Sequence, residues 1–171
     1  MAEMLIALSR RYLREYLTKI RLAVSVLDDD IIWARPNESS NSIGNLMLHL
    51  AGNVRQWIVS GVGGAPDVRD RPREFAEQSG APAAQLLDDL RAAVREADAV
   101  LGRLTAAQLV EPRRIQGFET NVLAAVFNVV AHFQGHTQEI IHITRARLGD
   151  AYRFDFVPQG LEQLSAGGSG V

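Results

Sequence analysis

The histidines are the residues of this sequence with the clearest potential for chemistry. His132 and His136 are four residues apart in a segment with helical periodicity, so both rings lie on one face of that helix. Side chains at this spacing lie roughly 5–6 Å apart at Cβ, and two imidazoles so placed can share one metal ion at about 2.0–2.1 Å. No glutamate follows His132 directly, so the pair is not the helical motif of zinc proteases.

A third histidine, His49, lies among apolar residues in the middle of another predicted helix. An unpaired imidazole inside a helix bundle is costly, so this ring needs a partner. If it meets His132 and His136 on one metal ion, open coordination positions remain for water or substrate, as in catalytic or ligand-binding sites. The alternative is that each histidine hydrogen-bonds a backbone or side-chain group of the core. Spacing alone leaves both interpretations open.

Three polar neighbours share the faces of these histidines. Glu139 follows His136 by three residues and is the candidate catalytic residue. It could accept a hydrogen bond from an imidazole, act as a fourth ligand or serve as general base, or it could be an exposed glutamate near the bundle end. Asn53 and Asn128 each lie one turn from a histidine and could orient a ring or a substrate, or make a core hydrogen bond. His142 lies about 120° around the helix from His136 and is left out of the site.

Four long helices must position these side chains, because apolar residues recur at spacings of three and four along most of the chain. Strand signals are scarce, with neither an Asn-Gly nor an Asp-Gly turn and no sustained alternation. Asn41 or Ser42 is the expected N-cap of the second helix. Residues 105–117 are expected to form a turn or short helix followed by a loop. The predicted helices span residues 3–27, 43–60, 82–104 and 120–148.

The connection between the second and third helices is unusually long. Residues 61–81 are rich in Gly, Pro, Asp and Arg, and about 20 residues exceed the usual connection in a compact domain. A long crossover lets the two helices run parallel, and it is also a candidate lid. The sequence therefore predicts an all-α four-helix bundle over residues 1–160. Tyr152, Phe154 and Phe156 are expected to pack back on it, and the Gly-rich residues 161–171 are expected to be a disordered tail.

The amino-acid composition excludes several kinds of functional site. The chain has 171 residues, 18 Lys and Arg against 20 Asp and Glu, and no cysteine. One domain is expected at this length, and the missing cysteine excludes a disulfide scaffold, a thiolate zinc site, an iron–sulfur cluster and a cysteine nucleophile. A net charge of −2 gives no electrostatic case for nucleic-acid binding. No apolar run of about 18 residues and no signal peptide is visible, so a cytoplasmic protein without membrane contact is expected.

The histidine pattern resembles that of the DinB-like superfamily, which includes the bacillithiol transferases and is similar to the mycothiol-dependent maleylpyruvate isomerase bundle. The motifs are one histidine in helix two, here His49, and a His-x3-His pair in helix four, here His132 and His136. Residues 45–53 and 132–141 read like these two helices. Where many relatives carry Gly-Gln two residues after the pair, this chain has Gln138-Glu139. The resemblance implies an up-down-down-up bundle, a divalent metal such as zinc or nickel, and a homodimer.

The expected function follows from that resemblance. We expect a metal-dependent enzyme with a small-molecule substrate, catalysing thiol-dependent transfer to an electrophile or metal-assisted hydrolysis. Because the chain has no cysteine, any thiol must come from a low-molecular-weight cosubstrate. The alternatives are a non-catalytic metal- or ligand-binding stress-response bundle, and a purely structural bundle without metal.

Overall fold

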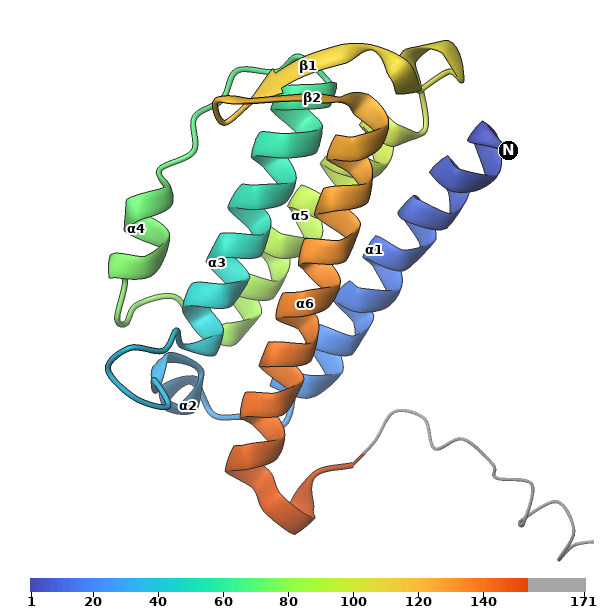
Figure 1. Cartoon of the computed structure of the whole chain (residues 1–171). Coiled ribbons are helices and arrows are strands. Elements are labelled where there is room, and N and C mark those ends of the chain that lie inside the picture. The colour runs from blue at the N-terminus through green and yellow to red at the C-terminus, as the bar shows by residue number, and fades with distance from the viewer. Residues whose placement is uncertain (154–171) are drawn as a thin grey trace, which may run out of the picture.

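The computed structural model describes residues 1–153 and confirms a mostly helical protein. Four long helices form a bundle (Figure 1): α1 (Ala2–Val24), α3 (Ile43–Val54) continued by the π-helical η1 (Arg55–Val62), α5 (Ala83–Leu101) and α6 (Val122–Leu148). The predicted packing of Phe154 and Phe156 and the predicted tail lie outside the described residues. The tail prediction at 161–171 and the domain boundary at 160 are therefore untested.

Each long helix packs on two others. α6 contacts α1 and α3, and α5 contacts α3 and α1. Figure 1 shows α3 and α5 running in the same sense, with α1 and α6 running in the opposite one. Three short helical segments lie in the connections, namely α2 (Asp29–Trp33), α4 (Arg71–Ala76) and η2 (Ala107–Val110), and a fourth, η3 (Gly149–Ala151), follows α6. The long crossover, for which no helix was predicted, thus contains α4.

The start of α3 is fixed by a capping box. The Ser42 hydroxyl accepts from the Asn45 backbone N–H, and the Asn45 side chain accepts from the Ser42 backbone N–H, so the N-cap prediction is correct for Ser42. The Asn45 amide also donates to the backbone carbonyls of Glu74 and Glu77, at 3.0 and 2.7 Å. One buried asparagine therefore both begins α3 and ties the end of α4 to it.

A two-stranded hairpin replaces the loop expected before α6. Antiparallel strands β1 (Pro112–Ile115) and β2 (Phe118–Asn121) lie across one end of the bundle (Figure 1). Gln116 and Gly117 form the turn with φ of 53° and 84°, the left-handed pair that a tight hairpin needs. The prediction was wrong here because the strands have four residues each and a Gln-Gly turn carries a weaker signal than Asn-Gly. The Asn121 side chain then caps α6.

The core lies between the four long helices. Its members are apolar residues with almost no exposed surface, and Phe133 of α6 stacks against Tyr16 of α1 with ring centroids 6.5 Å apart. The largest fully buried side chains are Phe133, Leu13, Ile20, Ile32, Ile43, Leu46, Met47, Leu50, Ile58, Leu90, Leu101 and Ile140.

An ion-pair cluster links α1 to α5 and gives a first prediction. Arg10 binds the Asp98 carboxylate through two nitrogens, at 2.9 and 2.7 Å, and Arg14 adds a bond of 2.8 Å. The hydrogen bonds from Arg10 lower the pKa of Asp98, against the opposing effect of burial. We expect Asp98→Asn to lower the free energy of unfolding at pH 7 by about 1 kcal/mol, a value reduced for partial exposure.

The pH dependence of this loss has a defined sign. A carboxyl with a lowered folded-state pKa stabilises the fold above its unfolded pKa near 4, and this stabilisation disappears as pH falls through the folded value. The difference between wild type and Asp98→Asn in urea unfolding should therefore shrink between pH 5 and pH 2. Asp88→Asn is the control, because Asp88 lies on the same helix with a side chain 70% exposed. If the difference in unfolding free energy between wild type and Asp98→Asn stays constant with pH, the ionised Asp98 carboxylate is not the source of the stabilisation.

Candidate metal centre

Three histidines from two helices converge. His49 of α3 meets His132 and His136 of α6, and one ring nitrogen from each lies within 4.8 Å of the others. The Nε2 atoms of His49 and His132 are 2.9 Å apart. His142 is exposed and is not part of this group. The helical spacing thus brings together the three histidines expected to meet and leaves out the fourth.

The cluster fits a divalent metal ion. A tetrahedral ion with bonds of about 2.0–2.1 Å holds its ligand atoms roughly 3.3 Å apart, so the nitrogens need to move only a little. Burial, together with the neighbouring His136 and His49 and the cations of Arg69 and Arg71, lowers the pKa of His132 to about 4. This ring is therefore neutral at pH 7 and offers a lone pair. An all-imidazole set suits zinc or nickel better than calcium or magnesium.

Glu139 contacts the outer nitrogen of one of these rings. Its Oε2 lies 2.7 Å from Nδ1 of His136, and its side chain is 42% exposed. A carboxylate that accepts the Nδ1–H leaves Nε2 of His136 free as a ligand. Glu139 is thus placed to orient His136, and its catalytic role stays a prediction.

Sequence reasoning missed two functional candidates, Arg69 and Glu74, which come from the crossover. Glu74 Oε2 lies 3.0 Å from His49 Nδ1, and Arg69 binds both carboxylate oxygens, at 2.6 and 2.8 Å. Burial alone would raise the pKa of Glu74, but the hydrogen bonds from Arg69 and His49 outweigh it and lower the pKa. Residues 61–81 carry no signal for this contact beyond the Asp70 and Pro72 that begin α4.

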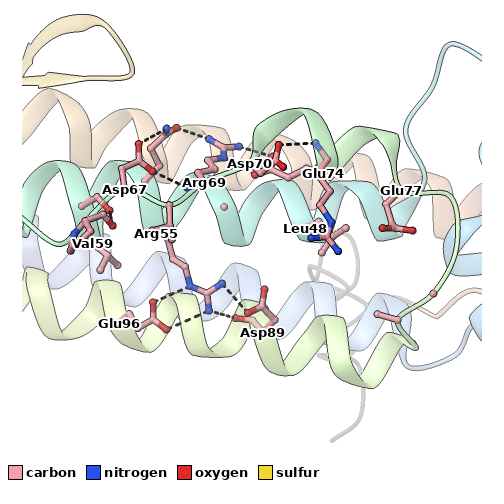
Figure 2. Close-up of a pocket in the computed structure, with 18 of the residues that line it drawn as sticks. Leu48, Arg55, Val59, Asp67, Arg69, Asp70, Glu74, Glu77, Asp89 and Glu96 are labelled. Atoms are coloured by element: carbon pink, nitrogen blue, oxygen red, sulfur yellow. Dashed lines mark hydrogen bonds and ion pairs between the residues drawn. The ribbon is translucent and has the colours of Figure 1, made fainter.

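The crossover also forms one side of the site. The ring of Phe75 lies 4.9 Å from that of His49. Behind the site, a cavity of about 740 Å³ is lined by Arg69 and Glu74 but by none of the three histidines. Figure 2 shows these two side chains along the cavity, with Arg55 reaching to Asp89 and Glu96 of α5. The buried ion pair therefore separates this cavity from the histidines.

The asparagines expected near the histidines differ in their environments. Asn53 is buried, and its Oδ1 has no hydrogen-bond partner among residues 1–153. Trp57, one turn further, is part of the core, but its Nε1 is equally unpartnered in the described structure. Asn128 is exposed, so it makes no core hydrogen bond.

Among residues 1–153, none of the helices has both the length and the apolar character that a membrane-spanning helix needs.

Comparison with solved structures shows the fold. A conserved protein from Enterococcus faecalis superposes with a TM-score of 0.73 at 15% identity, over 84% of this chain and 96% of that one. A DinB-like protein from Bacillus cereus superposes with a TM-score of 0.62 at 15% identity, over 80% and 90%. No curated protein matches the sequence.

The family is shown by sequence. The model of the mycothiol-S-transferases matches residues 8–145, which include all three clustered histidines and the whole crossover. Together with the two structures, this match confirms the resemblance to the DinB-like superfamily. It covers most of the chain, so the protein belongs to the mycothiol-S-transferase family.

Proposed function

We propose that this protein is a metal-dependent thiol transferase with its metal on His49, His132 and His136. The observation that carries the proposal is the convergence of three imidazole nitrogens within 4.8 Å, in a chain of the mycothiol-S-transferase family. A divalent ion on these rings would supply a Lewis acid that lowers the pKa of a bound thiol or water. The thiol must come from a low-molecular-weight cosubstrate because the chain has no cysteine.

The protein's own groups have distinct roles in this proposal. Glu139 orients His136, and the second oxygen of this half-exposed carboxylate is the candidate acceptor for the thiol proton. Phe75 beside His49 shields one side of the site from water. The sulfur then bonds to the electrophilic carbon of a small substrate, and the leaving group departs with its electron pair.

Metal-assisted hydrolysis is the second candidate reaction, because a three-imidazole site could equally activate water. A non-catalytic metal carrier would need the metal to be closed off by further ligands. The described residues show no fourth histidine or carboxylate in the cluster, which favours an open site.

The proposal extends to an up-down-down-up bundle, supported by the course of the helices in Figure 1, and to a cytoplasmic homodimer.

The reaction is tested with metal-loaded protein, mycothiol and a chromogenic aryl halide. We expect loss of the halide to depend on protein, on thiol and on zinc or nickel. The same assay is repeated with a panel of alkyl and epoxide electrophiles. If the protein binds metal but no electrophile reacts faster than it does with mycothiol alone, thiol transfer is contradicted. Hydrolysis of an activated ester without thiol would instead favour the hydrolase.

Glu139→Gln separates the role of this residue from that of its neighbours. We expect kcat to fall about 10- to 100-fold, because an amide neither takes up the proton nor anchors the His136 N–H as firmly. Gln138→Ala, at the exposed preceding position, is the control and should keep the activity of wild type. Equal kcat in both variants would remove Glu139 from the mechanism.

A further inference from the structure

Nδ1 of His49 lies within hydrogen-bond distance of two opposite kinds of group. Glu74 Oε2 is 3.0 Å away, and Arg69 Nη2 is also 3.0 Å away. An ionised carboxylate can only accept a hydrogen bond, and a guanidinium can only donate one. Each neutral tautomer of His49 therefore has its own partner. A ring with hydrogen on Nδ1 donates to Glu74, whereas a ring with its lone pair on Nδ1 accepts from Arg69.

The choice of tautomer decides what the other nitrogen can do. Nε2 of His49 is the atom that faces His132, at 2.9 Å. With hydrogen on Nδ1, Nε2 carries a lone pair that can bind a metal ion. With hydrogen on Nε2, that lone pair is lost and the position is blocked. The contact with Glu74 therefore favours the metal-binding tautomer, and the contact with Arg69 favours the other.

We propose that Glu74 is a positioning residue that selects the metal-binding tautomer of His49. Docking of the crossover, which in the structure spans residues 63–82 between η1 and α5, is thereby coupled to metal binding. This inference rests on the proposed metal site. It assigns to the crossover a control over metal affinity, in addition to its covering of the histidines.

The fold is built to hold this contact. The side chains of Arg69 and Glu74 are only 3% and 9% exposed, so the pair is shielded from water. Both lie across α3 at Gly52, where a Cβ atom would overlap Glu74 Oε1 and lie 2.9 Å from Arg69 Nε. The end of α4 is held to α3 by the Asn45 amide. Gly52 therefore provides the space through which the carboxylate reaches His49.

Coupling of this kind is reciprocal. If docking of the crossover strengthens metal binding, metal binding must stabilise docking by the same factor. We therefore expect zinc to slow backbone hydrogen exchange in residues 63–82, as well as near the histidines. The hairpin at Pro112–Asn121 packs on η1 at the bundle end, away from the crossover's contact with His49, and serves as the internal reference.

The experiment measures the zinc dissociation constant by competition with a chromophoric chelator, for wild type and three variants. We expect Glu74→Gln and Gly52→Ala to bind zinc about 10- to 100-fold more weakly, as when other partners of metal-bound histidines are removed. In Glu74→Gln, Arg69 takes the amide oxygen and the amide NH₂ faces His49. Glu77→Gln is the matched control, because Glu77 lies on the same segment and lines the same cavity, and Figure 2 shows its side chain apart from Arg69 and Glu74.

A second readout separates tautomer selection from general loss of structure. Nitrogen-15 spectra of the imidazole rings in metal-free protein should show His49 with hydrogen on Nδ1 in wild type and on Nε2 in Glu74→Gln. Circular dichroism shows which variants fold. If Glu74→Gln does not fold, the zinc affinity of Gly52→Ala decides the result. Zinc binding by wild type with unchanged affinity in the folded variants would overturn this inference and leave the metal site standing. Absence of zinc binding in wild type would overturn the proposed function itself.

Discussion

Replacing His49, His132 or His136 with alanine should reduce the bound divalent metal from about one equivalent per chain to almost none. Each ring supplies one of only three nitrogen ligands in the cluster, so each loss leaves two imidazoles and water. The loss should exceed the roughly 10- to 100-fold effect of removing a partner that touches a ligand only indirectly. Elemental analysis of untagged protein, purified without a nickel column, measures the result.

His142→Ala is the matched control for these three variants. His142 lies on the same helix as His132 and His136 but is exposed and outside the cluster, so this variant should keep its metal. If all four variants retain or lose metal alike, the three-histidine assignment is wrong. A purely structural bundle predicts a different pattern, in which His49→Ala lowers stability and metal is absent from every sample, wild type included.

Periodicity predicted the parts of the fold whose burial follows one helix face. The four long helices begin and end within a few residues of the predicted bounds, and Ser42 is the N-cap as its residue type and position indicate. The same rule placed His132 and His136 on one face. The long helices were predictable because both a capping residue and an apolar stripe are local properties of the sequence.

The contacts of the crossover were not predictable in this way. Glu74 is 25 residues from His49, and its contact depends on how α4 docks on α3. A six-residue helix has too few positions to show an apolar stripe. Gly52 contributes by lacking a side chain, which reads as a mild disadvantage within a helix until the overlapping Glu74 and Arg69 are seen. Such information is tertiary, so a single sequence carries little of it.

Two consecutive residues of α6 lie in different environments. His132 is half-buried at the metal centre, whereas Phe133 is fully buried in the core. The helix thereby anchors the site through its apolar face, because a rotation that moved the histidines would also expose Phe133. The rigidity of the site therefore depends on the packing of this phenylalanine.

Phe133→Ala should accordingly lower the free energy of unfolding by about 3–5 kcal/mol, because truncation leaves a cavity and removes the stacking on Tyr16. For a domain of this size, that corresponds to a fall in Tm of roughly 6–20 °C. Phe127→Ala is the matched control, since Phe127 lies on the same helix but is 68% exposed. It should change the stability by less than about 1 kcal/mol. Equal losses in the two variants would contradict the core described here.

The change in Tm caused by zinc separates a variant that only destabilises the fold from one that loses the metal site. Zinc that binds only the folded state stabilises by an amount set by its concentration relative to Kd. At a low temperature where Phe133→Ala is still folded, its three histidines are intact, so zinc should raise its Tm almost as much as it raises that of wild type. His132→Ala should gain nothing from the same zinc, although its side chain lies next to Phe133. A zinc-induced shift lost equally in both variants would show that the site cannot survive repacking of α6, whereas a shift lost only in His132→Ala places the ligand role on the imidazole.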